Sequence, residues 1–378
     1  MIFHYCKAGE TVLSIAREYG VSPIRLIEEN ALNDPERLAV GQCVAIYSSK
    51  RSYTVRGGDT FENIARRFLV SERELMKWNP GIGQRKLLYP GQILSLGRVE
   101  QSFGTLCVNG IVHSSTSLAK LSCFASALTY LTINVCFSDL ESDRTSLKIK
   151  DLTDFCHLNA IVPLLNLTKI EQPNELCEKL SSFGFGGVFI DFKVPSEALD
   201  SFCLALKEEG MISIIGKQHS NDDQFGDWIH FPFADHSCLA EKRFGEILDE
   251  TEDPYRTMIE LPHFAIERSV AGKTVLRTLP ACDCDRIAYR KNASISHLDN
   301  GKAAFSFLTA ASGKHDLHEI LYDDLEAIKN GLTLLGESGI AGISIYPEWS
   351  LKGLTNLLHR YFDVIKAEDG KNGVHFSR

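Results

Sequence analysis

The sequence lacks any long hydrophobic run. No apolar stretch in its 378 residues reaches the ~18 residues that a membrane-spanning helix requires. The first residues, MIFHYCKAGETV, also lack the charged-then-apolar pattern of a secretory signal. We therefore expect a chain without a membrane span, made and kept in a cytoplasm unless another route delivers it.

Paired cysteines of a metal site are also missing. The 11 cysteines are scattered singly, and only Cys282 and Cys284 lie close together. Their spacing is not the C-x-x-C of zinc sites, and no His/Cys cluster nearby completes one. We expect no metal and no cofactor. The cysteines are interpreted as buried reduced thiols, with crosslinking in an outer coat as the alternative.

A strongly basic balance is absent as well. The net charge is −9, but residues 1–100 carry 14 Lys+Arg against 11 Asp+Glu, so +3, and the remainder carries −12. A nucleic-acid partner of the larger part is therefore not expected, because phosphate binding needs a basic surface. The mildly basic front is compatible with anionic wall polymers.

The first hundred residues contain an internal repeat. Four landmarks recur 49 or 50 residues apart: Gly9 and Gly58, Ile15-Ala16 and Ile64-Ala65, Asn30 and Asn79, and Gly41-Gln42 and Gly91-Gln92. Each copy predicts a strand, two helices and a strand. The first glycine allows a tight turn, Thr11 or Thr60 caps the first helix, and Asn30 or Asn79 ends the second.

This pattern resembles the LysM module, over residues 2–47 and 52–97. The resemblance implies a shallow groove that binds N-acetylglucosamine units between the loop after the first strand and the loop after the second helix. The alternative is that these residues only shape turns. Two modules on the short linker 48–51 would gain avidity on one polymer. The groove residues expected are Gly9, Glu10, Thr11, Val12, Asn30, Ala31, Leu32, Gly58, Asp59, Thr60, Phe61, Asn79, Pro80, Gly81 and Ile82.

After Gly97 short apolar runs alternate with helical stretches, which indicates βα units and a parallel sheet. Eight such runs predict an α/β fold with a (β/α)8 TIM barrel over residues 104–367. The runs are Leu106–Val112, Leu131–Phe137, Ala160–Leu165, Gly187–Asp191, Met211–Ile215, Trp228–Phe233, Met258–Leu261 and Gly342–Tyr346. The helices expected include Asn174–Ser182, Glu197–Glu209, Asp323–Glu337 and Leu351–Ile365.

The fourth run, Phe185 to Lys193, is similar to the strand-four motif D-G-x-D-x-D-x-E of family 18 glycoside hydrolases. The match is to the compact branch that carries LysM modules and acts on spore cortex peptidoglycan. The resemblance places Leu106–Gly110 in the first strand and Glu319–Asp324 before the last barrel helix. It also assigns Ala288–Arg290 and Ala303–Phe307 to a late hairpin.

The resemblance implies chemistry in which the substrate's acetamido oxygen is the nucleophile and a glutamic acid protonates the leaving oxygen. Asp191 of the motif is retained, but the acid's position holds Lys193. After strand six, the family's tyrosine and aspartate become Phe233 and Ala234. The other departures are Gly186 and Phe189 for the first two aspartates and Tyr346 for a tryptophan, while Asp235 and Glu348 are expected at the barrel mouth.

Two functions follow from these observations. The first is a protein that binds peptidoglycan or another N-acetylglucosamine polymer and presents a barrel released from catalysis. The alternative is an active N-acetylglucosaminidase that uses a non-standard acid. The family resemblance places the protein on the spore coat, cortex or cell wall of a Gram-positive bacterium, with coat or cortex proteins as further possible partners.

Overall fold

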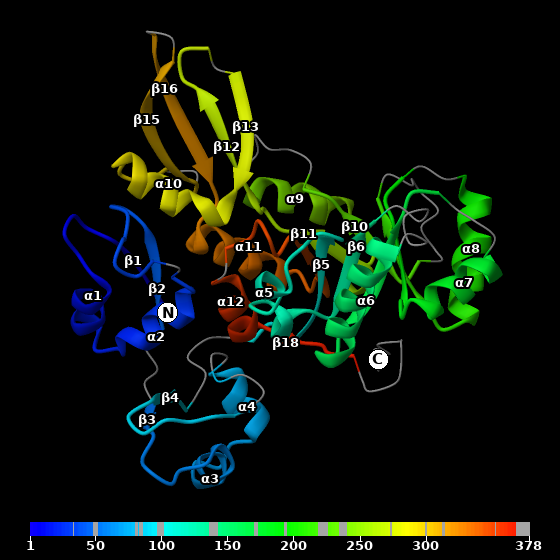
Figure 1. The fold of residues 1–378 in the computed structure, drawn as a ribbon, viewed down its shortest axis with the longest axis horizontal. Helices are drawn as coiled ribbons and strands as arrows, with labels where there is room; N and C mark the ends of the chain where they lie inside the picture. Colours follow the sequence, from blue (N-terminus) through cyan, green and yellow to red (C-terminus); the bar gives the residue numbers. More distant parts are fainter. Residues whose placement is uncertain are drawn as a thin grey trace. The chain divides into compact units, whose positions relative to one another are not determined.

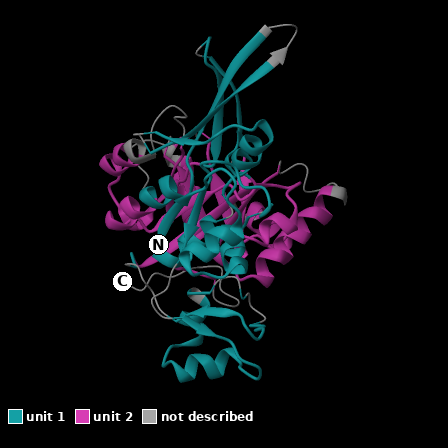
Figure 2. Cartoon of the chain, turned by 90° about the vertical axis from the view of Figure 1, so that its left-hand side faces the viewer, with its two compact units in different colours: residues 1–103, 263–331, 349–362 teal, residues 104–262, 332–348, 363–378 magenta. Residues whose placement is uncertain are grey.

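The structure is a computed structural model that describes residues 1–32, 34–47, 52–79, 82, 86–96, 102–135, 143–169, 173–192, 195–217, 226–233, 240–272, 274–298, 301–311, 314–351 and 353–367. Its chain forms two compact units (Figure 2). One unit combines residues 1–103, 263–331 and 349–362, and the other combines residues 104–262, 332–348 and 363–378.

The second unit holds a closed parallel β-barrel, so the predicted TIM barrel is confirmed (Figure 1). Each strand pairs with the next in chain order, and β17 returns to pair with β5. All eight predicted strands are present. They are β5 (Thr105–His113), β6 (Tyr130–Asn134), β7 (Val162–Leu167), β8 (Gly187–Ile190), β9 (Ile212–Gly216), β10 (Trp228–Phe231), β11 (Thr257–Glu260) and β17 (Gly342–Ile345).

Helices follow most of the barrel strands, in the βα order that the sequence predicts. Three of the four predicted helices match to within two residues at either end: α7 (Pro173–Ser182), α8 (Ser196–Glu208) and α11 (Leu325–Glu337). The remaining helices of the barrel unit are α5 (Leu118–Leu121), α6 (Asp143–Leu158) and α9 (Ala240–Glu250), with 3-10 turns η2 (Ala125–Ala127) and η4 (Pro254–Arg256).

The helix predicted over Leu351–Ile365 was too long. Helix α12 spans Leu354–Tyr361, and the chain then forms the short strand β18 (Asp363–Val364). The N–H of Asp363 donates to the carbonyl of Gly104, and the N–H of Ile365 donates to that of Leu106. These bonds to the start of β5 replace the helical ones, which is why the helix ends early.

The other unit contains a five-stranded antiparallel sheet in the order β13-β12-β16-β15-β14. Ala303–Phe307 lies in a hairpin strand as predicted, but Ala288–Arg290 was assigned wrongly, because it lies in helix α10 (Cys284–Lys291), whose Ala288 packs in the core under the sheet. The strands are β12 (Phe264–Ser269), β13 (Thr274–Pro280), β14 (Ser296–His297), β15 (Ala303–Ala311) and β16 (Lys314–Tyr322), and η5 covers Ala281–Asp283.

Both repeats fold as predicted, strand, helix, helix, strand. The side chains of Thr11 and Thr60 accept hydrogen bonds from the N–H groups of Ser14 and Asn63, so both threonines cap the first helix of their module. The first copy has β1 (Ile2–Tyr5), α1 (Val12–Tyr19), α2 (Pro23–Asn30) and β2 (Cys43–Ile46), and the second has β3 (Ser52–Thr54), α3 (Phe61–Arg67), α4 (Glu72–Lys77) and β4 (Ile93–Ser95).

The first module packs against the antiparallel sheet of its own unit. Ala39 belongs to the same buried cluster as Ala265 and Phe305. The N–H of Ile295 donates to the carbonyl of Val40 at 2.8 Å. The ring of Tyr5 lies 3.9 Å, centroid to centroid, from that of His297. The module is therefore held by apolar packing and backbone hydrogen bonds together.

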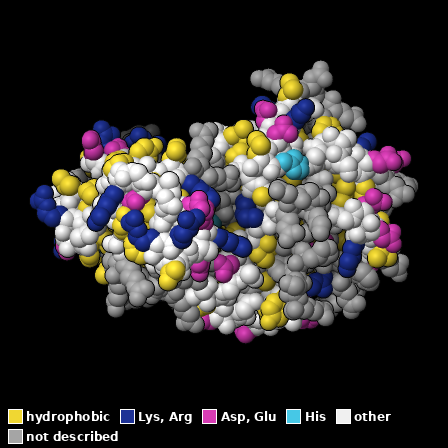
Figure 3. Space-filling view, turned by 90° about the horizontal axis from the view of Figure 1, so that it is seen from below, with side chains coloured by type: hydrophobic (Ala, Val, Ile, Leu, Met, Phe, Trp, Pro, Cys, Tyr) yellow, Lys and Arg dark blue, Asp and Glu magenta, His cyan; other side chains and the backbone are white. Residues whose placement is uncertain are grey.

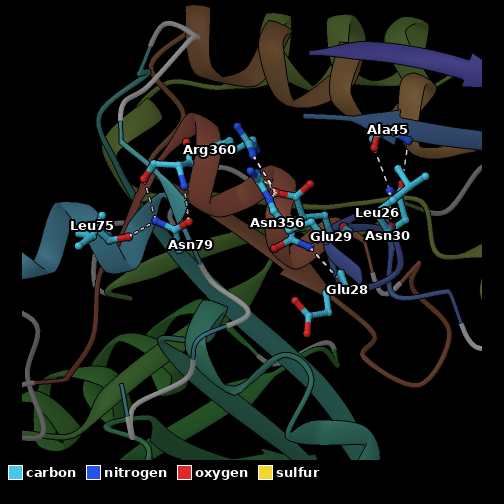
Figure 4. Close-up of polar contacts among 11 residues, drawn as sticks. Leu26, Glu28, Glu29, Asn30, Ala45, Leu75, Asn79, Asn356 and Arg360 are labelled. Carbon is cyan, nitrogen blue, oxygen red and sulfur yellow. Dashed lines mark hydrogen bonds and ion pairs between the residues drawn. The ribbon is translucent and has the colours of Figure 1, made fainter. Parts of the chain in front are cut away.

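The first module also contacts helix α12 (Figure 4). Asn356 donates its side-chain N–H to the carbonyl of Glu29, and the guanidinium of Arg360 lies 3.4 Å from the Glu29 carboxylate. The same guanidinium stands 3.9 Å from the centre of the Tyr47 ring, a cation–π distance.

No helix among the described residues is long and apolar enough to cross a membrane. Seven of the nine cysteines that the structure describes are buried, Cys282 is half-buried and Cys123 is exposed. Burial raises the pKa of the Cys107 thiol to about 12, so this thiol is a packing group and not a reactive one.

Candidate functional site

In each module a residue at the start of the first helix and a residue after the second helix pack on the same hydrophobic core. Val12 is buried in the first core, and Leu32 of the second loop packs against the same cluster. Phe61 and Ile82 have the same relationship in the second module. The structure thus places one residue from each of the two predicted segments in a shared cluster, and the groove itself stays a prediction. Pro80 and Gly81 lie outside the described residues.

The acidic residue of the first loop closes the turn in both modules. Glu10 accepts a hydrogen bond from the N–H of Lys7 at 2.7 Å and a second bond from His4. Asp59 accepts from the N–H of Arg56 at 2.7 Å and from the Tyr53 hydroxyl at 2.6 Å. The backbone bond from Lys7 lowers the pKa of Glu10, and the Tyr53 bond lowers that of Asp59. Both carboxylates therefore fix the loop conformation.

Asn30 is the last residue of α2 as predicted, whereas Asn79 lies two residues beyond the end of α4, and both side chains make internal hydrogen bonds (Figure 4). The Nδ2 group of Asn30 donates to the carbonyls of Leu26 and Ala45, and its Oδ1 accepts from the Ala45 N–H. Asn79 makes the matching three bonds to Leu75 and Ser95. These amides hold the second loop against the last strand, so their side chains support the predicted groove from inside. Sugar contact by either residue stays a prediction.

Charges are mixed on the face shown in Figure 3, where basic, acidic and hydrophobic side chains lie interspersed. Lys and Arg side chains gather most densely in the left-hand part of this view, with acidic and hydrophobic side chains among them.

Inward-facing positions of the barrel can be identified by the two-residue period of a strand. Phe189, Ile214, Trp228 and Met258 belong to the buried cluster inside the barrel. The residues two positions further along these strands therefore also face inward, one step nearer the carboxyl ends. They are Asp191, Gly216, His230 and Glu260.

Asp191 lies directly after β8, where the resemblance places it. A Cβ atom on Gly216, at the end of β9, would stand 2.4 Å from Asp191 Oδ1. The glycine therefore leaves the space that the carboxylate occupies. Tyr346, after β17, packs partly on the interior cluster. Burial, with the charges of Glu260 and Asp191, raises the pKa of the Tyr346 hydroxyl.

Glu260 is the residue that sequence reasoning missed. It is the last residue of β11 and only 5 % exposed. Burial, with a smaller contribution from the charge of Asp191, raises the pKa of its carboxyl to about 8, although a hydrogen bond from the Phe233 N–H acts in the opposite direction. At neutral pH Glu260 is therefore a neutral acid. An acidic residue inside the apolar run Met258–Leu261 was the available signal.

His230 faces the same interior and gives Glu260 no positive partner. Its Nε2 lies 3.8 Å from Glu260 Oε2, which is too long for a hydrogen bond. Burial lowers the pKa of the imidazole to about 3, so the ring is neutral. At neutral pH the imidazole of His230 and the carboxyl of Glu260 are therefore two neutral groups in contact and do not form an ion pair.

Several polar atoms in this interior layer have no hydrogen-bond partner among the described residues. They are Asn109 Nδ2, Asn166 Oδ1, both ring nitrogens of His230 and Ser344 Oγ. Asn109 and His230 are at most 1 % exposed. Buried polar atoms normally bond to protein, solvent or ligand, so this layer can receive polar groups.

Of the remaining predicted barrel residues, the structure describes Phe233, Glu348 and Gly186. Phe233 is buried, with its ring 6.1 Å from that of Phe244, so its side chain serves the core. Glu348 accepts a hydrogen bond from the Thr116 hydroxyl at 3.0 Å and lies 3.6 Å from the Lys120 ammonium. Gly186 precedes β8, and its N–H donates to the carbonyl of Pro163. Lys193, Ala234 and Asp235 lie outside the described residues.

Comparison with known proteins identifies the repeats. Residues 4–46 and 53–97 match the family model of the LysM domain. An endolysin of Bacillus phage B103 is 31 % identical over 98 residues, which cover 25 % of this chain and 37 % of the endolysin. The chain thus spans little more than a third of the length of this curated relative.

Solved structures of similar fold cover nearly the whole chain. The spore cortex-lytic enzyme SleL of Bacillus cereus is 18 % identical, with a TM-score of 0.70 over 97 % of this chain and 99 % of that one. SleL of Bacillus megaterium QM B1551 is 16 % identical, with a TM-score of 0.65 over 96 % and 98 %. The predicted combination of two LysM modules with a TIM barrel is confirmed, and the solved SleL structures share this fold.

Proposed function

We propose that this protein binds an N-acetylglucosamine-containing cell-wall glycan, peptidoglycan or spore cortex, through its two LysM modules at 2–47 and 52–97. The observation that carries the proposal is the repeated loop arrangement. Both modules pack residues from the same two segments on one core and contain the same capping and asparagine bonds. Backbone groups of these loops would hold the acetamido group while Leu32 or Ile82 covers a sugar face.

A pelleting experiment tests this proposal. The full chain is mixed with insoluble purified peptidoglycan, and the bound fraction is measured with increasing N-acetylglucosamine oligomers or, as the control, glucose oligomers of equal length. We expect only the acetylated sugars to release the protein, because the acetamido group supplies the hydrogen-bonding groups. Equal release by both sugars, or no pelleting, would contradict the proposal.

Matched variants locate the binding surface. Leu32→Ala and Ile82→Ala remove one apolar contact from the second loop of each module, and Leu69→Ala removes an apolar side chain that is 93 % exposed on the second module. We expect weaker pelleting for the two loop variants and a larger loss when they are combined, since the modules act on one polymer. The Leu69→Ala protein should pellet as the parent chain does.

For the barrel, residues 104–367, we propose that hydrolysis does not follow the usual family 18 scheme. Lys193 stands at the acid's position, and Phe233 cannot donate a hydrogen bond to the substrate. Loss of general acid help typically costs ~10²–10⁴-fold in rate. Introducing Lys193→Glu with Phe233→Tyr and Ala234→Asp should create or raise activity if the site has decayed from that scheme.

A second candidate function is hydrolysis of the bound glycan with an acid from another strand. The buried carboxyl of Glu260, on the barrel interior near Asp191, favours it. Following the fold relatives, whose names describe spore cortex-lytic enzymes, we propose the spore coat, cortex or wall of a Gram-positive bacterium as the place of action.

A further inference from the structure

The interior of the barrel carries two carboxyl groups at its carboxyl end, and they have different surroundings. Asp191 is exposed after β8, whereas Glu260 is buried at the end of β11. Both carboxyl groups face inward. They lie close enough together for the charge of Asp191 to raise the pKa of the Glu260 carboxyl. Catalytic chemistry in TIM barrels is placed at this end of the strands.

The groups that face Glu260 keep its proton in place. Asp191 contributes a like charge from β8, and His230 on β10 is neutral because it is buried. Tyr346 after β17 carries a hydroxyl whose pKa is raised, so it too is uncharged at neutral pH. Among the described residues, the N–H of Phe233 bonds to the carboxylate and favours its ionisation. That bond also fixes the side chain's direction.

We propose that Glu260 is the catalytic acid of the barrel, replacing from strand seven the acid that the family supplies from strand four. This assignment rests on the second candidate function above. The orphaned polar atoms of Asn109, His230 and Ser344, on strands that flank or face β11, make the same layer able to receive polar groups of a ligand.

The reaction balances with the residues present. The Glu260 carboxyl gives its proton to the glycosidic oxygen as the bond from that oxygen to C1 breaks and the alcohol leaves. The substrate's acetamido oxygen closes on C1, and the Asp191 carboxylate stabilises the positive charge that forms. Water then attacks C1, the bond to the acetamido oxygen breaks, and the Glu260 carboxylate takes the water's proton. Both groups end as they began.

The test uses the full chain with Glu260→Gln. This substitution keeps the size and shape of the side chain and removes the carboxyl proton. Asp227→Asn is the matched control, because that carboxylate lies before β10 at the opposite end and bonds to Ser213. Release of reducing ends from peptidoglycan and from N-acetylglucosamine oligomers is measured. A dinitrophenyl N-acetylglucosaminide, whose leaving group needs no proton, is assayed alongside.

We expect Glu260→Gln to lower glycan hydrolysis by about 10²–10⁴-fold and dinitrophenyl release by less than about tenfold. Glycan hydrolysis by the parent chain should fall as the pH rises through about 8. Asp227→Asn should retain both activities. The same preparations are tested for pelleting, so failure of this assignment is separable from failure of glycan binding.

Three results would overturn the assignment. One is the absence of any turnover by the parent chain on all three substrates. Another is full glycan hydrolysis by Glu260→Gln. The third is an equal loss on both classes of leaving group with a lowered melting temperature, which would identify a structural role.

Discussion

Asn79 and Ser95 exchange a pair of hydrogen bonds across the second module. Asn79 Nδ2 donates to the Ser95 carbonyl at 2.9 Å, and the Ser95 N–H donates to Asn79 Oδ1 at 2.7 Å. The amide thus serves one residue of β4 as a neighbouring strand would. Asn30 makes the same pair of bonds with Ala45 in the first module. Its Nδ2 donates to the Ala45 carbonyl at 2.8 Å, and its Oδ1 accepts from the Ala45 N–H at 2.7 Å.

The first prediction concerns this tie. Asn79→Ala removes both hydrogen bonds between the side-chain amide and the buried main chain of Ser95, so the free energy of unfolding of the module should fall by roughly 2–4 kcal/mol. Hydrogen exchange of the Ser95 amide in the full chain measures the effect. Asn63→Ala, on the exposed face of α3, is the control and should leave the exchange rate unchanged. Equal rates in Asn79→Ala and the parent chain would contradict the prediction.

The second prediction concerns Gly41, where the first module meets the antiparallel sheet. Its φ is +81°, and an added Cβ would stand 1.9 Å from the Ile295 carbonyl oxygen. Gly9 has a φ of +80° but open space around it. Gly41→Ala should therefore lower the free energy of unfolding by about 1–3 kcal/mol more than Gly9→Ala does. Both variants carry the backbone strain of a positive φ, but only the Cβ at position 41 clashes with the Ile295 carbonyl. Urea unfolding of both variants gives the difference, and equal values would show that no clash forms.

The third prediction is a pH dependence centred on His297. Its Nε2 lies 2.9 Å from the Gly41 carbonyl oxygen and its Nδ1 lies 3.2 Å from Asp324, so both nitrogens donate in the charged ring. Burial lowers the pKa of His297, but the bonds to Asp324 and Gly41 outweigh it and the pKa is raised overall.

Because the folded-state pKa lies above the unfolded value, this contribution to stability is complete below the unfolded pKa of about 6.5. It is lost as the pH rises through the folded pKa. Urea unfolding from pH 5.5 to 8.5 should show that His297→Gln removes part of the slope. His315→Gln, at an exposed position, should keep the slope of the parent chain. A parent-like slope in His297→Gln would exclude this residue as the source.

The fourth prediction separates the stability effect of Glu260 from any activity. The folded state holds a proton on Glu260 up to about pH 8, whereas its reference value is 4.5. Between these values the folded chain binds more protons, so the free energy of unfolding should decrease as the pH rises. Glu260→Gln should remove this decrease and melt at a higher temperature than the parent chain at pH 8.5. A lower melting temperature at that pH would contradict the raised pKa.

The barrel strands were predictable because each is a short apolar run between helices. The same property prevented the sequence from identifying Glu260 as a residue of the barrel interior. Strands buried on both faces read as continuous hydrophobic segments, so the sequence does not show which residues point inward. Only the closed barrel reveals that Glu260 shares its interior with Asp191 and His230.

The modules were predictable because two copies repeat the same landmarks. The sequence placed Asn30 and Asn79 at helix ends, but their bonds reach strands 15 and 16 residues away. Likewise, the predicted helix ran to Ile365, whereas α12 ends at Tyr361 and the next residues pair with β5. Both features depend on long-range partners that local pattern does not encode.

The contact between Asn356 and Glu29 joins residues 327 positions apart. During synthesis at about 5–20 residues per second, the first module waits roughly 15–65 s for the helix that covers it. The surface around Glu29 is therefore open to solvent, chaperones or a neighbouring nascent chain for most of translation. A chain stalled before Asn356 would present its first module without the contacts that α12 provides.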